Sequence, residues 1–156
     1  MRLFWLNDKN EDLRILPAFS SAFLRLALGF TFLSAVADRF GVWGAFGEPH
    51  VAWGTFARFV VYTGNLNWFL PRTIIPTLAI VATGAEIILG LLLLLGWRTR
   101  ITALLSGTLC LLFALTMTVA LGIKAPLDAS VFVDAGAGFL LASCAEYPFS
   151  IDHVGR

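Results

Sequence analysis

Four long apolar stretches, separated by polar segments, dominate the chain from residue 18 onward. They cover about residues 18–37, 73–95, 101–121 and 126–145. A helix rises 1.5 Å per residue, so crossing a bilayer takes about 20 apolar residues in a row. Each stretch meets that length and is predicted to be a transmembrane helix. The fourth is rich in small residues, which are common where helices touch inside membranes.

Short connections join the last three predicted helices. The segments "GWRTR" and "GIKAP" leave room only for tight turns, so successive helices must run antiparallel. The sequence therefore predicts an all-α fold, an integral membrane four-helix bundle, with residues 1–156 forming a single domain.

One long loop, residues 38–72, separates the first two predicted helices and is rich in aromatic residues and glycine. Its middle, Val51 to Tyr62, is predicted to form a short helix entered at Pro49. The loop is either an aromatic belt at the membrane interface or a lid over a hydrophobic ligand. In the second interpretation the candidate ligand-binding residues are Trp53, Phe56, Tyr62 and Trp68.

The composition agrees with a membrane protein. Hydrophobic residues make up 58% of the chain and charged residues 13%, with a mean hydropathy of +0.83. Soluble domains carry roughly 25% charged residues. The expected partner is therefore the lipid bilayer, and a net charge of +1 argues against nucleic acid.

The distribution of basic residues predicts the orientation. The N-terminal segment lacks a signal-peptide cleavage site and is expected to lie at the interface. Under the positive-inside rule both termini are predicted to be cytoplasmic. One side carries Arg2, Lys9, Arg14, Arg98, Arg100 and Arg156, and the other carries Arg39, Arg58, Arg72 and Lys124.

Three charged residues are predicted to lie inside the membrane. At 1.5 Å per residue, Glu86 and Arg25 lie about 15 Å and about 12 Å from the cytoplasmic boundary, and Asp134 about 12 Å from the outer one. Arg25 is therefore expected to pair with Glu86, with Asp134 nearby. Asp38 and Arg39, with Asp128 at the same level, are expected to be ordinary interfacial residues, and the alternative is a second, outer polar cluster.

Helical periodicity places both members of the expected pair on stripes of small residues, so they should point into the bundle. Intramembrane charges are costly and often functional. Arg25, Glu86 and Asp134 are thus candidate catalytic residues, and the alternative is an ionic latch that fixes helix register. No metal-ligand spacing is present, and Cys110 and Cys144 are predicted at different depths, too far apart for a disulfide.

Three segments resemble the DoxX family of four-helix membrane proteins. These are "RLALGFTFL", "GAEIILGLLLLLGWRTRITAL" and the acidic residue in the fourth, small-residue stretch, and together they cover about residues 24–143. The resemblance implies a bacterial or archaeal inner-membrane, multi-pass protein, with relatives that include the membrane subunit of thiosulfate:quinone oxidoreductase.

Two functions follow from these observations. The first is a quinone-interacting or accessory subunit of a membrane oxidoreductase, at most one subunit of an enzyme. No cofactor is encoded, so electrons would come from a redox partner subunit. The second is a non-catalytic membrane scaffold or a small-molecule permeation protein. Homo-oligomerisation is compatible with both.

Overall fold

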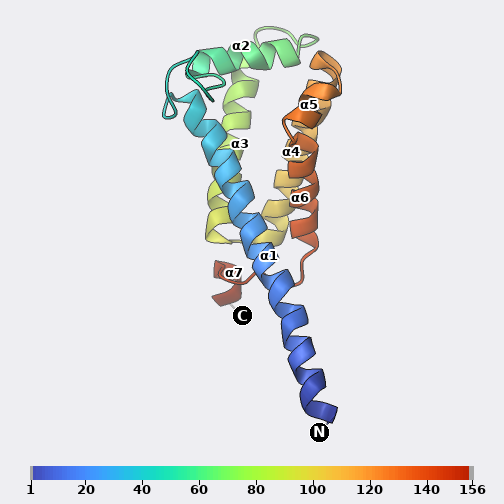
Figure 1. Cartoon of the computed structure of the whole chain (residues 1–156). Coiled ribbons are helices and arrows are strands. Elements are labelled where there is room, and N and C mark those ends of the chain that lie inside the picture. The colour runs from blue at the N-terminus through green and yellow to red at the C-terminus, as the bar shows by residue number, and fades with distance from the viewer. Residues whose placement is uncertain (1, 155–156) are drawn as a thin grey trace.

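The computed structural model describes residues 2–154, with side chains for residues 18–152, and this part of the chain contains helices and no strands (Figure 1). The predicted all-α membrane fold is confirmed. The helices are α1 (Arg2–Arg39), α2 (Phe56–Leu66), α3 (Ile75–Leu95), α4 (Thr99–Leu121), α5 (Lys124–Asp128), α6 (Val131–Ser143) and α7 (Ile151–Val154). Arg156 and the side chains of Arg2, Lys9 and Arg14 lie outside the described residues.

Three of the described helices are long and apolar enough to cross a membrane. They are α3, α4 and the part of α1 from Ala18 to Arg39. The apolar helix α6 is shorter, at 13 residues. α2 lies across one end of the bundle, and the N-terminal part of α1 projects beyond the other end (Figure 1). The long loop and the termini are therefore at opposite ends, and the apolar outer faces of the long helices contact the bilayer.

Two pairs of helices pack through glycines that allow close approach. Gly29 of α1 faces Gly90 of α3, where an added Cβ on Gly90 would lie 3.2 Å from the Gly29 carbonyl oxygen. Gly107 of α4 faces Gly138 of α6, where an added Cβ on Gly138 would lie 2.6 Å from the Gly107 Cα. Small residues are what such membrane contacts require.

The predicted inward faces are confirmed by burial. Around Glu86, Ala79, Ala82 and Thr83 are all buried, whereas Ile80 on the opposite side is exposed. The stripe around Arg25 is buried in the same way at Ser21, Ala22 and Gly29. Helical periodicity therefore located the interior of the bundle correctly.

The fourth predicted span is not a continuous helix. α5 ends at Asp128, and Ser130 adopts a left-handed backbone with φ of 57° before α6 begins. Lys124 and Asp128 form an exposed ion pair on α5. Alanine favours a helix, but serine is a weaker helix former that favours turns and helix ends, and the chain turns at Ser130.

The short helix in the loop also begins later than predicted. Thr55, in an extended conformation, caps α2 by accepting a hydrogen bond from the Arg58 N–H. A threonine is a preferred N-cap, so the helix begins at Phe56 rather than near Val51. The residues before it form an irregular loop with left-handed backbone at His50 and Gly54.

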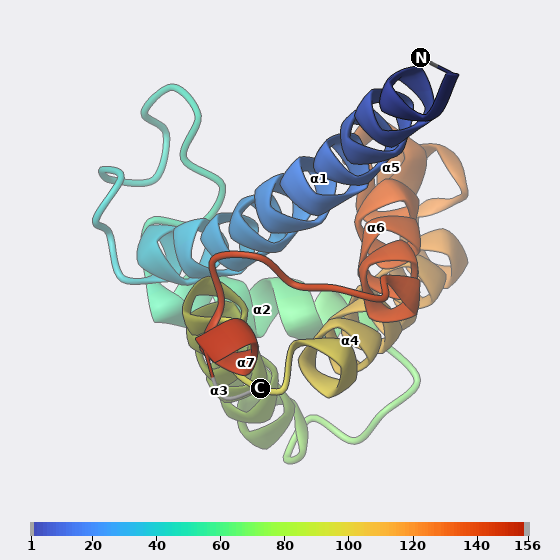
Figure 2. The same ribbon diagram turned by 90° about the horizontal axis from the view of Figure 1, so that it is seen from below.

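The C-terminal segment ties helix ends together at the end of the bundle where the termini lie (Figure 2). The chain leaves α6, crosses this end and reaches the α3–α4 turn at α7. The Asp152 carboxylate there accepts from the backbone N–H groups of Arg98 at 2.8 Å and Thr99 at 2.6 Å. It therefore caps the N-terminus of α4, where the N-cap residue Arg98 makes no capping hydrogen bond with its own side chain.

Candidate functional site

A buried ion pair joins α1 to α3 towards the end of the bundle that carries the loop. The Arg39 Nη2 donates to Glu86 Oε1 at 2.9 Å, and Nη1 contacts the other carboxylate oxygen. The same Nη1 donates to the Thr83 hydroxyl at 2.8 Å. Arg39 is 2% exposed and Glu86 3% exposed. Glu86 is thus tolerated in the membrane because Arg39 neutralises it.

Aromatic rings from the loop and α2 cover the arginine. The Arg39 guanidinium carbon lies 3.6 Å from the ring centroid of Phe59 and 5.2 Å from that of Trp53. Trp53 meets Phe59 edge-on, and Tyr62 tilts against Trp53 at 5.8 Å. Burial raises the pKa of the Tyr62 hydroxyl, which keeps it neutral. Cation–π contacts hold the guanidinium in place and exclude water from the pair.

The expected Arg25–Glu86 pair is wrong. Arg25 is 2% exposed, but its Nη1 donates to the carbonyl oxygens of Leu93 at 2.7 Å and Leu94 at 2.8 Å. Its Nη2 donates to the Phe149 carbonyl oxygen at 2.6 Å. Arg25 therefore satisfies the C-terminal end of α3, where backbone carbonyls lack helical partners and the helix dipole favours a cation.

The direction of side chains along a helix explains both results. In an α-helix each Cα–Cβ bond tilts towards the N-terminus. On α1 this tilt carries Arg25 away from Glu86, towards the end of α3. It carries Arg39, at the last position of α1, back into the membrane towards Glu86. The expectation that Arg39 is an ordinary interfacial residue is therefore also wrong.

Asp134 lies apart from the Arg39–Glu86 pair. It is in the first turn of α6 and is half-buried, with no ion pair among the residues the structure describes. Arg25, Glu86 and Asp134 thus do not form one cluster.

A membrane-facing groove lies directly beside the ion pair. It has a volume of about 330 Å³ and is walled by two stacked rings, Phe40 and Phe56, with centroids 6.0 Å apart. Thr83, whose hydroxyl accepts the hydrogen bond from Arg39, is part of its lining. The apolar side chains of Ile80 and Ile87 complete it, together with the backbone of Gly84. We call this feature the outer groove.

The four aromatic residues predicted to bind a ligand occupy different places. Phe56 lines the outer groove. Trp53 and Tyr62 belong to the aromatic cover over Arg39. Trp68 is 70% exposed and packs edge-on against Phe69, away from these contacts.

Sequence reasoning missed three residues that define this site, namely Arg39, Phe59 and Phe40. The available signal was the arginine at the end of the first apolar stretch, whose side chain tilts inward. Within the described part of the chain, no group of three metal-ligating side chains exists, and Cys110 and Cys144 are both free thiols.

Comparison with known proteins identifies the family. The family model described as methylamine utilisation protein MauE matches residues 17–130, which is most of the chain. No curated protein and no solved structure matches the chain. The protein belongs to the MauE family of membrane proteins.

This match corrects the resemblance to the DoxX family, which is wrong. The segments that carried the resemblance are a glycine-flanked leucine run, a basic turn and an intramembrane glutamate. Each has a structural cause in this chain. Gly90 lets α1 approach, Gly96 adopts a left-handed backbone with φ of 66° at the turn, and Glu86 pairs with Arg39. Such features do not distinguish one family of membrane hairpins from another.

Proposed function

We propose that this protein is an accessory membrane subunit of an oxidation system and binds the ring of a membrane quinone in the outer groove. The family description names methylamine utilisation, and the use of a reduced one-carbon amine requires its oxidation. The observation that carries the quinone proposal is Thr83, which links the groove to the buried ion pair behind it.

The chemistry of the outer groove suits a quinone ring. The ring of a quinone is flat and apolar with two carbonyl oxygens, and its tail is a hydrocarbon. Phe40 and Phe56 offer aromatic surfaces, and the groove faces the lipid, where the tail would remain. The Thr83 hydroxyl accepts from Arg39 and makes no hydrogen bond as a donor among the described residues. Its proton is therefore free for a carbonyl oxygen.

The ion pair behind the groove would act by positioning. Glu86 holds the Arg39 guanidinium, which in turn orients the Thr83 hydroxyl. A fixed donor costs less reorganisation when a ligand binds. Asp134, half-buried in the first turn of α6, lies outside the lining of the outer groove and has no role in this contact, whereas Arg25 supports the end of α3. Electrons would come from a redox partner subunit, as expected from the sequence.

A scaffold without catalytic function is the second candidate. The burial of the ion pair supports this candidate. Arg39 and Glu86 are each at most 3% exposed and are paired with one another. In this second proposal the ion pair has a purely structural role, which is to hold the loop and α1 on α3. The two proposals differ in whether the outer groove has an occupant.

Purification with native lipids tests the occupant. The purified protein should retain quinone, quantified by extraction and chromatography, and Gly84→Leu should reduce the retained amount by about 5-fold or more by filling the groove. Gly84 is suitable because an added Cβ there meets no atom within 4 Å, so the fold should tolerate the change. Gly136→Leu is the matched control, since Gly136 also has an open Cβ position but lies on α6.

Thr83→Val then tests the polar contact. It keeps the shape of the side chain but removes the hydroxyl, and should weaken quinone retention in a protein that still folds. Retention that is equal in the Gly84→Leu and Gly136→Leu variants would refute the groove. Absence of quinone from the unmodified protein would favour the scaffold.

A further inference from the structure

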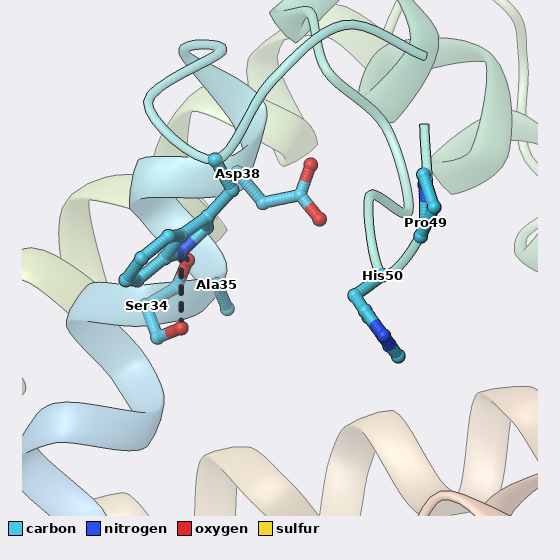
Figure 3. Close-up of a pocket in the computed structure, with 6 residues that line it drawn as sticks. Ser34, Ala35, Asp38, Pro49 and His50 are labelled. Carbon is cyan, nitrogen blue, oxygen red and sulfur yellow. Dashed lines mark hydrogen bonds between the residues drawn. The ribbon is translucent and has the colours of Figure 1, made fainter. Parts of the chain in front are cut away.

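A separate cavity opens where the end of α1 meets the loop (Figure 3). It shares no lining residue with the outer groove and has a volume of about 560 Å³. This volume is in the range of small-molecule sites, about 300–1,000 Å³. We call it the loop cavity, and its lining residues are Ser34, Ala35, Asp38, Trp43, Pro49 and His50.

The charged group of the loop cavity is Asp38, which is 6% exposed. Its carboxylate accepts from three backbone N–H groups, those of Ala52 at 2.7 Å, Trp53 at 3.1 Å and Gly54 at 2.9 Å. A carboxylate offers about four acceptor positions, so these contacts fix its orientation and leave one position open. Figure 3 shows the carboxylate turned from α1 towards the segment that carries Pro49 and His50.

Asp38 has no cationic partner in the described part of the chain. The neighbouring Arg39 acts on it electrostatically, but the Arg39 guanidinium is bonded to Glu86 and Thr83. The C-terminal end of α1 adds its own negative potential at this point. The electrostatics of the loop cavity therefore favour a positively charged occupant.

Two further residues shape the loop cavity for an organic cation. The Trp43 indole N–H donates to the Ser34 carbonyl oxygen and hydroxyl, both at 3.1 Å, which fixes the ring while leaving Trp43 59% exposed. An indole face attracts cations. His50 lines the same cavity from a left-handed backbone with φ of 68°, a strained conformation for a residue other than glycine.

We propose that the loop cavity binds a small organic ammonium ion. The Asp38 carboxylate accepts a hydrogen bond from the ammonium group, and the Trp43 ring contacts its positive charge. A divalent metal fits less well, since no group of three metal ligands exists among the described residues. This inference goes beyond the proposed quinone contact, because it concerns another cavity and another class of ligand. The loop cavity would bind a cation, whereas the outer groove would bind an uncharged ring.

The test compares two probes of nearly the same shape. Benzylammonium and the neutral benzyl alcohol are titrated into the full protein in lipid nanodiscs, with binding followed by calorimetry. Benzylammonium is expected to bind at least about 10-fold more tightly, since only its donor group carries a positive charge that pairs with the Asp38 carboxylate. Trp43→Leu should weaken benzylammonium binding about 5-fold through loss of the cation–π contact.

Trp68→Leu is the matched control, because Trp68 is also exposed but lies outside the loop cavity. It should leave binding unchanged. Equal affinity for the two probes would overturn the proposal whatever the variants do. Equal binding by the Trp43→Leu and Trp68→Leu proteins would overturn the placement of the site at the loop cavity.

Discussion

The Arg39–Glu86 pair can be tested by a double-mutant cycle. Glu86→Gln keeps the shape of the side chain but leaves the Arg39 guanidinium buried without a counter-charge. Removing one partner of a buried pair costs about 3–5 kcal/mol of folding free energy. We expect about 3 kcal/mol here, because Thr83 and the ring of Phe59 still contact the arginine in the variant.

The second single variant and the double variant complete the cycle. Arg39→Met removes the cation and its contacts with the aromatic rings, and should cost a similar amount, about 3 kcal/mol. Arg39→Met combined with Glu86→Gln leaves no buried charge and should cost only about 2–3 kcal/mol in total. The coupling free energy is therefore expected to be about 3 kcal/mol.

Unfolding by titration of a denaturing detergent, followed by circular dichroism, measures these free energies. A matched control replaces Arg25 instead, because Arg25 is equally buried but bonds to carbonyl oxygens at the end of α3. Arg25→Met and Glu86→Gln should be additive within about 0.5 kcal/mol. Additivity in the Arg39 cycle, or strong coupling in the Arg25 cycle, would refute the assignment of partners.

Three further predictions concern packing, capping and topology. Gly138→Ala should cost about 1–3 kcal/mol by forcing α4 and α6 apart, whereas Gly136→Ala, whose Cβ meets no atom, should be nearly neutral; thermal unfolding compares them. Asp152→Ala should cost about 1 kcal/mol by removing the cap of α4, and Asp152→Asn should recover much of this loss. Cysteines placed at Gly47 and Arg100, with the native cysteines replaced, should be labelled by an impermeant thiol reagent from the outside and from the cytoplasm respectively; labelling from the opposite sides would invert the proposed orientation.

The positions of the membrane helices could be predicted because apolar length and helical period are local properties of the sequence. The buried faces of α1 and α3 were predictable for the same reason. The break at Ala129–Ser130 was not, because small residues permit both a helix and a turn. The start of α2 was within reach, since Thr55 is a preferred capping residue that sequence reasoning did not use.

The partners of the buried charges were harder to predict, and depth alone was an insufficient guide. Arg25 and Glu86 have similar expected depths, yet the packing of Gly29 against Gly90 puts Arg25 level with the end of α3, and side-chain direction carries it further that way. A further cause is competition from the backbone. The carbonyl oxygens at the end of α3 need donors, and Arg25 satisfies them. The partner of an intramembrane arginine can thus be a helix end as well as a carboxylate.

The last turn of α1 joins the long loop to α3 through two adjacent residues. Successive residues on a helix point about 100° apart. Asp38 therefore binds the backbone of the loop at residues 52–54, while Arg39 binds Glu86 on α3 and packs under Trp53 of the same loop. Any displacement of the loop must break contacts of one residue or the other. The loop cavity contains Asp38, and the outer groove contains Thr83, the partner of Arg39. The two cavities consequently share a single support, the last turn of α1.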